Sequence, residues 1–190
     1  MDYIPTRNGS TYFTFRAGPV WGVVLDCGED KPDTNIEYGL PEYGGVASFL
    51  PFRNAEAAYL DALADAVPYD AEGITRRVAL CHINFTYTDR PYNDKNPALY
   101  EKWIAALNRI GIDMLICGHE HKVGLQPDDY FHGAPTPSFK TLLTSAHCDN
   151  PLPLKGGHKP GEYTGTALTF TKDGVKHAFT NHKGEELDFQ

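Results

Sequence analysis

Three histidines stand directly after two apolar runs of the sequence. His82 follows the run RVALC, and His119 and His121 follow the run IDMLIC, from which Gly118 separates them. Neutral imidazole is a common ligand for zinc, iron, manganese and nickel. If the fold brings the three rings together, they can hold a divalent metal ion. A single histidine at a strand end is more often an ordinary hydrogen-bonded residue, so the prediction depends on the three together.

The pattern around these residues predicts how they meet. Arg77–Cys81 and Ile112–Cys117 are short apolar runs without alternation, which is typical of strands buried on both faces. Between them, Asn96-Pro97 starts a helix that ends at Gly111. Its apolar face comprises Leu99, Trp103, Ala106, Leu107 and Ile110. We therefore predict a βαβ unit at about 77–117, with parallel strands whose carboxyl ends meet at one edge of the sheet, where ligands collect.

Gly118, two aspartates and five further histidines also need a predicted role. Gly118 is expected to mark a sharp turn, so that the residues after it project from the edge. Asp26 and Asp30 could bring a carboxylate there, but we favour strand-end and turn roles for both. The remaining histidines are expected to be exposed or hydrogen-bonded; they are His132, His147, His158, His177 and His182.

The rest of the chain predicts a mixed α and β domain spanning 1–190. Strands are expected at Ser10–Arg16, Val20–Asp26 and Phe139–Ala146. Tyr163–Thr171 and Val175–Thr180 flank Asp173-Gly174, a hairpin turn signal. A helix capped by Asn54 and ending before Pro68 has apolar positions at helical spacing, namely Leu60, Leu63, Ala64 and Val67.

Composition excludes several classes of protein. The chain has 190 residues, 41% hydrophobic and 22% charged, with a net charge of −8, so nothing draws it generally to nucleic acid or anionic lipid. Its apolar runs are shorter than the ~20 residues of a membrane span. Four cysteines without a CxxC pair are typical of buried thiols. Reduced thiols and the absence of a signal-peptide core favour a cytoplasmic location.

The sequence resembles the calcineurin-like metallophosphoesterases. The run ICGHEH resembles the family's GHxH motif, and LCHINF resembles the preceding strand with its single histidine ligand. The segment YFTFRAGPVWGVVLDCGED is similar to a strand pair ending in an Asp-containing loop, so the resemblance covers about Tyr12 to Val123. It implies a mixed sheet that is part of an αββα sandwich. It also implies that His82 and His119 bind one metal ion and His121 the other, with Glu120 beside them.

The same resemblance implies a hydrolase. A complete site would bind two divalent ions (Mn, Fe, Zn or Ni) and hydrolyse small-molecule phosphate monoesters or diesters through a metal-activated hydroxide. The family's Asp-x-His, Gly-Asp-x-x-Asp and Gly-Asn-His motifs do not occur in this sequence, and Asn84 replaces the usual proline two residues after His82. The chain thus resembles the C-terminal half of such an enzyme, an incomplete domain.

The missing motifs set an electrostatic expectation. Two dications roughly 3.5–4 Å apart need carboxylates to offset their repulsion, and three neutral imidazoles supply none. We therefore expect the chain to bind at most one metal weakly, to hydrolyse phosphate esters poorly, and to self-associate through an exposed sheet edge. Two alternatives stay open: a degenerate, non-catalytic phosphoesterase-like binding or scaffold domain, and a mononuclear zinc hydrolase with Glu120 as general base.

Overall fold

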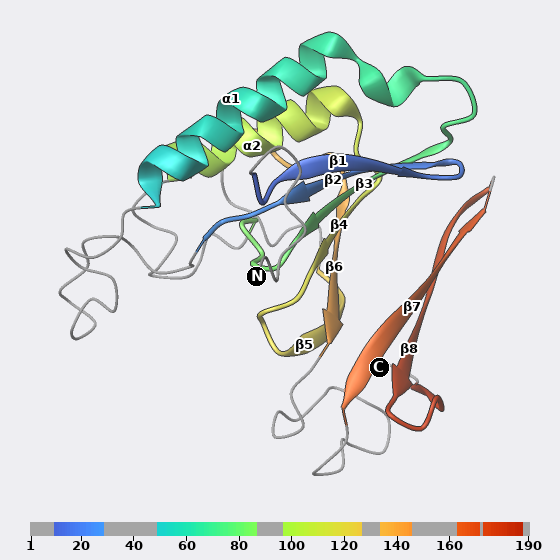
Figure 1. Ribbon diagram of the computed structural model, residues 1–190. Coiled ribbons are helices and arrows are strands. Elements are labelled where there is room, and N and C mark those ends of the chain that lie inside the picture. The colour runs from blue at the N-terminus through green and yellow to red at the C-terminus, as the bar shows by residue number, and fades with distance from the viewer. Residues whose placement is uncertain are drawn as a thin grey trace, which may run out of the picture.

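A six-stranded mixed sheet forms the centre of the molecule (Figure 1). The computed structural model describes residues 10–28, 49–86, 97–126, 134–145, 163–171 and 173–187. Within them the strands lie in the order β1-β2-β3-β4-β6-β5, and β2, β3, β4 and β6 run parallel, while β1 and β5 are antiparallel edge strands. Their bounds are β1 Phe13–Ala17, β2 Val20–Leu25, β3 Arg76–Cys81, β4 Met114–Cys117, β5 Lys122–Leu125 and β6 Lys140–Ser145.

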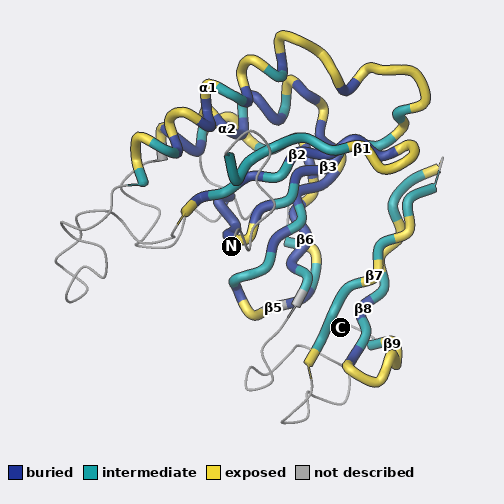
Figure 2. The backbone as a smooth tube through the Cα atoms, in the orientation of Figure 1, coloured by how far each residue is buried: buried dark blue, intermediate teal, exposed yellow. Residues whose placement is uncertain are grey.

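Two helices cover one face of this sheet. They are α1 (Leu50–Ala66) and α2 (Pro97–Ile110), which lie side by side in Figure 1. The five apolar residues predicted for one face of α2 are all buried, and Trp103 is wholly enclosed. In Figure 2 the buried residues, in dark blue, concentrate in the central strands and recur along the two helices. The predicted βαβ unit is confirmed, because α2 connects the parallel strands β3 and β4.

A second, smaller sheet contacts the opposite face near β6. It consists of β7 (Thr164–Thr171), β8 (Gly174–Asn181) and β9 (Glu186–Leu187), all antiparallel. Phe179 of β8 joins a small apolar cluster with Met114 and Leu142 of the large sheet. The predicted C-terminal hairpin is confirmed, with Thr171 paired to Gly174.

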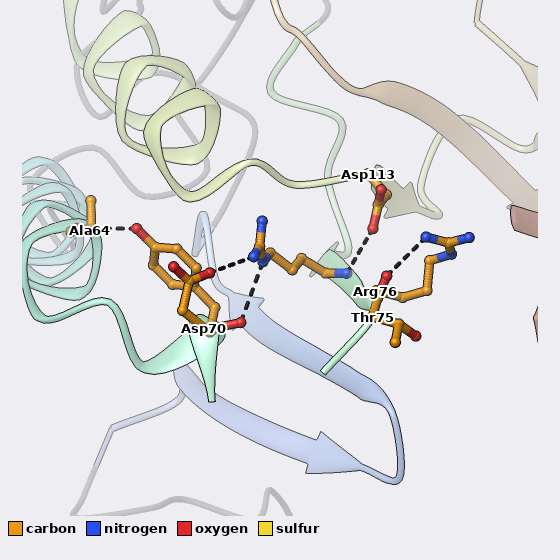
Figure 3. Close-up of polar contacts among 7 residues, drawn as sticks. Ala64, Asp70, Thr75, Arg76 and Asp113 are labelled. Carbon is orange, nitrogen blue, oxygen red and sulfur yellow. Dashed lines mark hydrogen bonds and ion pairs between the residues drawn. The ribbon is translucent and has the colours of Figure 1, made fainter. Parts of the chain in front are cut away.

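The amino ends of β3 and β4 are aligned by side chains rather than by strand pairing alone (Figure 3). The Arg77 backbone N–H donates to the Asp113 carboxylate at 2.8 Å, and the Arg77 guanidinium pairs with Asp70 at 2.5 Å. The Tyr69 hydroxyl in turn donates to the Ala64 carbonyl at the end of α1. These contacts fix the start of both strands, so that Cys81 and Cys117 become register partners at their carboxyl ends.

Two local predictions are wrong, and one strand was not predicted. Asn54 does not cap α1: the helix begins one turn earlier, with Pro51 in its first turn, and the Asn54 amide donates to the Leu50 carbonyl inside it. Val67 lies beyond the helix in a left-handed conformation (φ 53°) and is 39% exposed instead of packing in the core. Strand β5 was not expected, because its sequence KVGL carries too short a pattern to stand out from a loop.

Candidate functional site

The central sequence prediction, that distant histidines meet at one edge, is confirmed for His82 and His119. His82 directly follows β3, and His119 follows β4 after one intervening residue, Gly118. The two strands are parallel, so both histidines lie at their carboxyl ends. The His119 Nδ1 and His82 Nε2 atoms are 3.3 Å apart, and the ring planes are nearly perpendicular, with centroids 5.2 Å apart. A backbone hydrogen bond of 3.0 Å from the Gly118 N–H to the His82 carbonyl extends the pairing to these residues.

The separation of the two nitrogens suits two ligands of one metal ion. For metal–nitrogen bonds of ~2.05 Å at a tetrahedral angle, the two ligand atoms lie about 3.3 Å apart. The observed 3.3 Å fits this value, and it is also the distance of a hydrogen bond between the two rings. His82 is exposed and His119 half-buried, so both nitrogens can be reached from solvent. Two of the three predicted ligands therefore have the spacing that a shared ion requires.

His121 lines the same cavity but stands apart from this pair. The cavity, of about 630 Å³, opens beside the ends of β2, β3 and β4 and is lined by all three histidines. Within the ranges that the structure describes, however, no three His, Cys, Asp or Glu side chains are arranged to hold one ion. His121 is thus placed at the site without completing the ligand set of His82 and His119.

The turn that carries these residues is conformationally strained. His119 (φ 61°) and His121 (φ 50°) both adopt the left-handed region, which costs a non-glycine residue ~1–2 kcal/mol. Gly118 stands where the chain turns after β4, as predicted, although its own φ lies outside the left-handed region. A Cβ at this position would lie 3.3 Å from His82 Nδ1, a tight contact that glycine avoids.

Glu120 does not face the cavity. Its side chain is 6% exposed, and it is not among the residues that line the cavity with its neighbours His119 and His121. A general base must reach the water or substrate that it deprotonates. The structure therefore gives no support to the mononuclear mechanism in which Glu120 acts as base.

Asp26 brings a carboxylate to the rim, although its main contacts are those of a turn residue. It lines the cavity, and its Oδ1 accepts the Gly28 N–H at 2.8 Å, as the turn interpretation predicted. The Asp26 N–H donates to the Glu56 carboxyl at 2.8 Å, and the Arg53 guanidinium donates to the Cys27 carbonyl at 2.7 Å. Helix α1 thus holds the backbone of this rim through two buried ionisable side chains.

Three cysteines lie beneath the site as neutral core residues. Cys27, Cys81 and Cys117 are buried and free, and the sulfurs of Cys27 and Cys81 are 3.5 Å apart. The contact with Cys81 and burial both raise the pKa of Cys27, and burial raises the pKa of Cys117. The thiols stay protonated at neutral pH, so the interpretation of these cysteines as buried apolar residues is confirmed for all three. Cys148 lies outside the described residues.

The remaining predictions for polar and aromatic residues divide in two. His177 and His182 are exposed and belong to the small sheet, away from the cavity. His132, His147, His158 and Asp30 lie outside the described residues. Phe85, in the loop after β3, packs in the core against Tyr100 and Trp103.

A group of polar residues next to the site was not expected from the sequence. Asn84 and Thr86 are fully buried, and Asn84 donates to Gln126, which follows β5, at 2.6 Å. In the sequence, Asn84 was notable only because it replaces the proline that metallophosphoesterases usually carry two residues after the single histidine. No local pattern links it to Gln126, because the contact depends on how the chain folds back through β5.

Comparisons with known proteins leave the family open. No protein-family model matches the chain, and no curated protein matches it. Among solved structures the chain is similar to GAP50, the anchor in the inner membrane complex of Plasmodium, with 10% sequence identity and a TM-score of 0.48. The match covers 96% of this chain and 56% of that one, so the chain spans little more than half of its length. In the described part of the chain, no helix combines the length and apolarity needed to cross a membrane.

Proposed function

We propose that this chain carries the histidine part of a divalent-metal site in a metallophosphoesterase-like αββα sandwich. The complete site would hydrolyse phosphate monoesters or diesters. The observation that carries this proposal is the 3.3 Å separation of the His82 and His119 ring nitrogens at the carboxyl ends of adjacent parallel strands. It agrees with the sequence resemblance, in which these two residues share one ion and His121 serves the other.

The residues present suit one role in such a reaction. A bound divalent metal supplies a Lewis acid that lowers the pKa of water and offsets charge on the phosphoryl oxygens. His82 and His119 would hold it through neutral nitrogens, and His121 lines the space beside them. The neighbouring strands contribute the apolar residues Val24 and Leu80 to the lining of the cavity.

The charge balance explains why the chain alone should be a poor catalyst. Of the described residues that line the cavity, Asp26 is the one carboxylate, and one of its oxygens already accepts the Gly28 N–H. Two neutral imidazoles hold a single dication weakly. We therefore expect at most one bound metal per chain and little turnover, with further carboxylates needed for a dinuclear site.

Metal titration tests the site directly. Isothermal titration with Mn²⁺ and Zn²⁺ is expected to give at most one weak site, lost in His82→Ala and His119→Ala and kept in the control His177→Ala on the small sheet. Unchanged metal binding in both site variants would overturn the proposal.

Turnover tests the second part of the proposal. With Mn²⁺, p-nitrophenyl phosphate and bis-p-nitrophenyl phosphate should be hydrolysed slowly or not at all. Robust turnover that both site variants abolish would show that the chain is a complete phosphoesterase, and the expectation of an incomplete site would then be wrong.

A non-catalytic binding or scaffold domain is the second candidate. It is favoured by the finding that the described residues hold no set of three ligand side chains around one position. Metal titration separates the two candidates, because a scaffold has no need of the histidine pair. Absence of binding at millimolar Mn²⁺ and Zn²⁺ would favour the scaffold.

A further inference from the structure

The loop after β3 carries a buried polar network in an otherwise apolar region. Asn84 and Thr86 are 0% exposed and Thr141 of β6 is 5% exposed. The Asn84 Oδ1 accepts both the Thr86 N–H at 3.0 Å and the Thr86 hydroxyl at 2.6 Å. Burying so many polar atoms is costly unless each has a partner, and a satisfied network of this kind fixes one local geometry.

Gln126 connects this loop to the other histidine turn. Its Oε1 accepts from Asn84 Nδ2 at 2.6 Å, its Nε2 lies 3.3 Å from Thr86 Oγ1, and its backbone N–H donates to the Thr141 carbonyl at 2.9 Å. Gln126 directly follows β5, and β5 directly follows His121. The Asn84–Gln126 bond therefore joins the segment after His82 to the segment after His121.

A closed ring of contacts results around the candidate site. On one side the Gly118 N–H donates to the His82 carbonyl, and on the other Gln126 bonds to Asn84. Between these two points lie His119 and His121, both in left-handed conformations that isolated residues avoid. Strained residues persist only where their surroundings hold them. Pairing of β5 with β6 holds the chain directly after His121, and the Asn84–Gln126 bond adds a link from there to the segment after His82.

From this ring we infer that Gln126 and Asn84 are positioning residues, which set the distance between the His82 and His119 rings. The inference rests on the proposed function for its purpose, since the ring geometry matters only if the pair binds a ligand. Neither residue lines the cavity, so each acts through the histidine-bearing turns. Loss of the Asn84–Gln126 bond should let the two turns separate while the parallel strands beneath them stay paired.

The test uses three variants of the whole chain. Gln126→Ala removes the bond, Gln126→Glu keeps an acceptor for Asn84 Nδ2, and Asn108→Ala is the matched control. Asn108 makes a comparable set of bonds from α2, to the Thr136 carbonyl and to Ser138, away from the cavity. It therefore reports the effect of losing a similar polar cross-link elsewhere.

Two readouts separate this inference from the proposed function. The first is the nuclear Overhauser effect between the His82 and His119 rings in metal-free protein, and the second is the Kd for Zn²⁺. In Gln126→Ala we expect the nuclear Overhauser effect between the two rings to fall by about half and the Kd for Zn²⁺ to rise about tenfold. Gln126→Glu should restore both quantities, and Asn108→Ala should leave both unchanged.

The outcomes divide cleanly. A wild-type ring-to-ring effect in Gln126→Ala, or an equal loss in Asn108→Ala, would overturn the inference. If the wild-type chain binds no Zn²⁺, the proposed function fails, and the ring-to-ring effect in metal-free Gln126→Ala still decides whether Gln126 positions the histidines.

Discussion

Replacement of Glu56 by glutamine should remove a large part of the pH dependence of stability. Glu56 is fully buried between α1 and the sheet, and one carboxyl oxygen accepts the Asp26 N–H. Its other oxygen has no hydrogen-bond partner among the described residues. Burial raises the pKa of Glu56 from 4.5 to about 8, against the lowering effects of the Asp26 N–H and the Arg53 charge.

The sign and size of the effect follow from the two pKa values. Because the folded chain holds this proton more tightly, stability is fully present below pH 4.5 and is lost as pH rises towards 8. Each pKa unit corresponds to ~1.4 kcal/mol, so the whole loss is about 5 kcal/mol, and about 3.5 kcal/mol of it falls between pH 5 and 8. Glutamine keeps the acceptor for Asp26 and does not titrate, so Glu56→Gln should lack this slope.

Urea unfolding at several pH values between 5 and 8.5 measures the slope. The free energy of unfolding of wild type, relative to that of Glu56→Gln, should fall by about 4 kcal/mol across this range. Glu72→Gln is the control, because Glu72 is exposed and its replacement should leave the wild-type slope intact. Parallel curves for wild type and Glu56→Gln, within about 1 kcal/mol, would refute a buried, protonated Glu56.

Three further results are expected. The free energy of unfolding should be about 1 kcal/mol higher for His121→Gly than for His121→Ala, because alanine keeps the left-handed strain. Equal stabilities in urea would contradict a left-handed φ at residue 121. Trp103→Ala should lower the free energy of unfolding by about 3–5 kcal/mol, as judged by thermal unfolding. Arg109→Ala breaks exposed ion pairs with Asp61 and Asp65 and should lower it by less than about 1 kcal/mol. A larger loss for Arg109→Ala than for Trp103→Ala would be inconsistent with the packing. Among the described residues β1 is an edge strand, and such an edge should cause concentration-dependent association in sedimentation velocity. A monodisperse monomer at all concentrations would speak against it.

Sequence reasoning succeeded where a pattern repeats over many residues. The apolar face of α2 extends over four turns, and the flanking runs are apolar throughout, so the βαβ unit follows from periodicity and length alone. Parallel strands then require that His82 and His119 meet, whatever their separation along the chain. This part of the site is a consequence of topology, which is why it could be predicted.

The features that the sequence did not reveal depend on single contacts between distant segments. The start of α1 is set by Pro51 and by packing, so the capping preference of Asn54 was overridden. Asn84 and Gln126 meet only because β5 returns along β6. The left-handed backbone of His119 could not be predicted either, because glycine usually adopts this conformation and the glycine at 118 stands directly beside it.

The backbone of the histidine turn argues against a purely structural role for this edge. Elsewhere in the described chain, left-handed positions are mostly glycine, as at Gly28 and Gly111, where they cost nothing. At 119 and 121 the sequence uses histidine instead, at a cost of ~1–2 kcal/mol each. A scaffold would be more stable with glycine at both positions. Histidine at both positions is what the proposed metal site requires, and the spacing of the His82 and His119 rings fits a shared ligand.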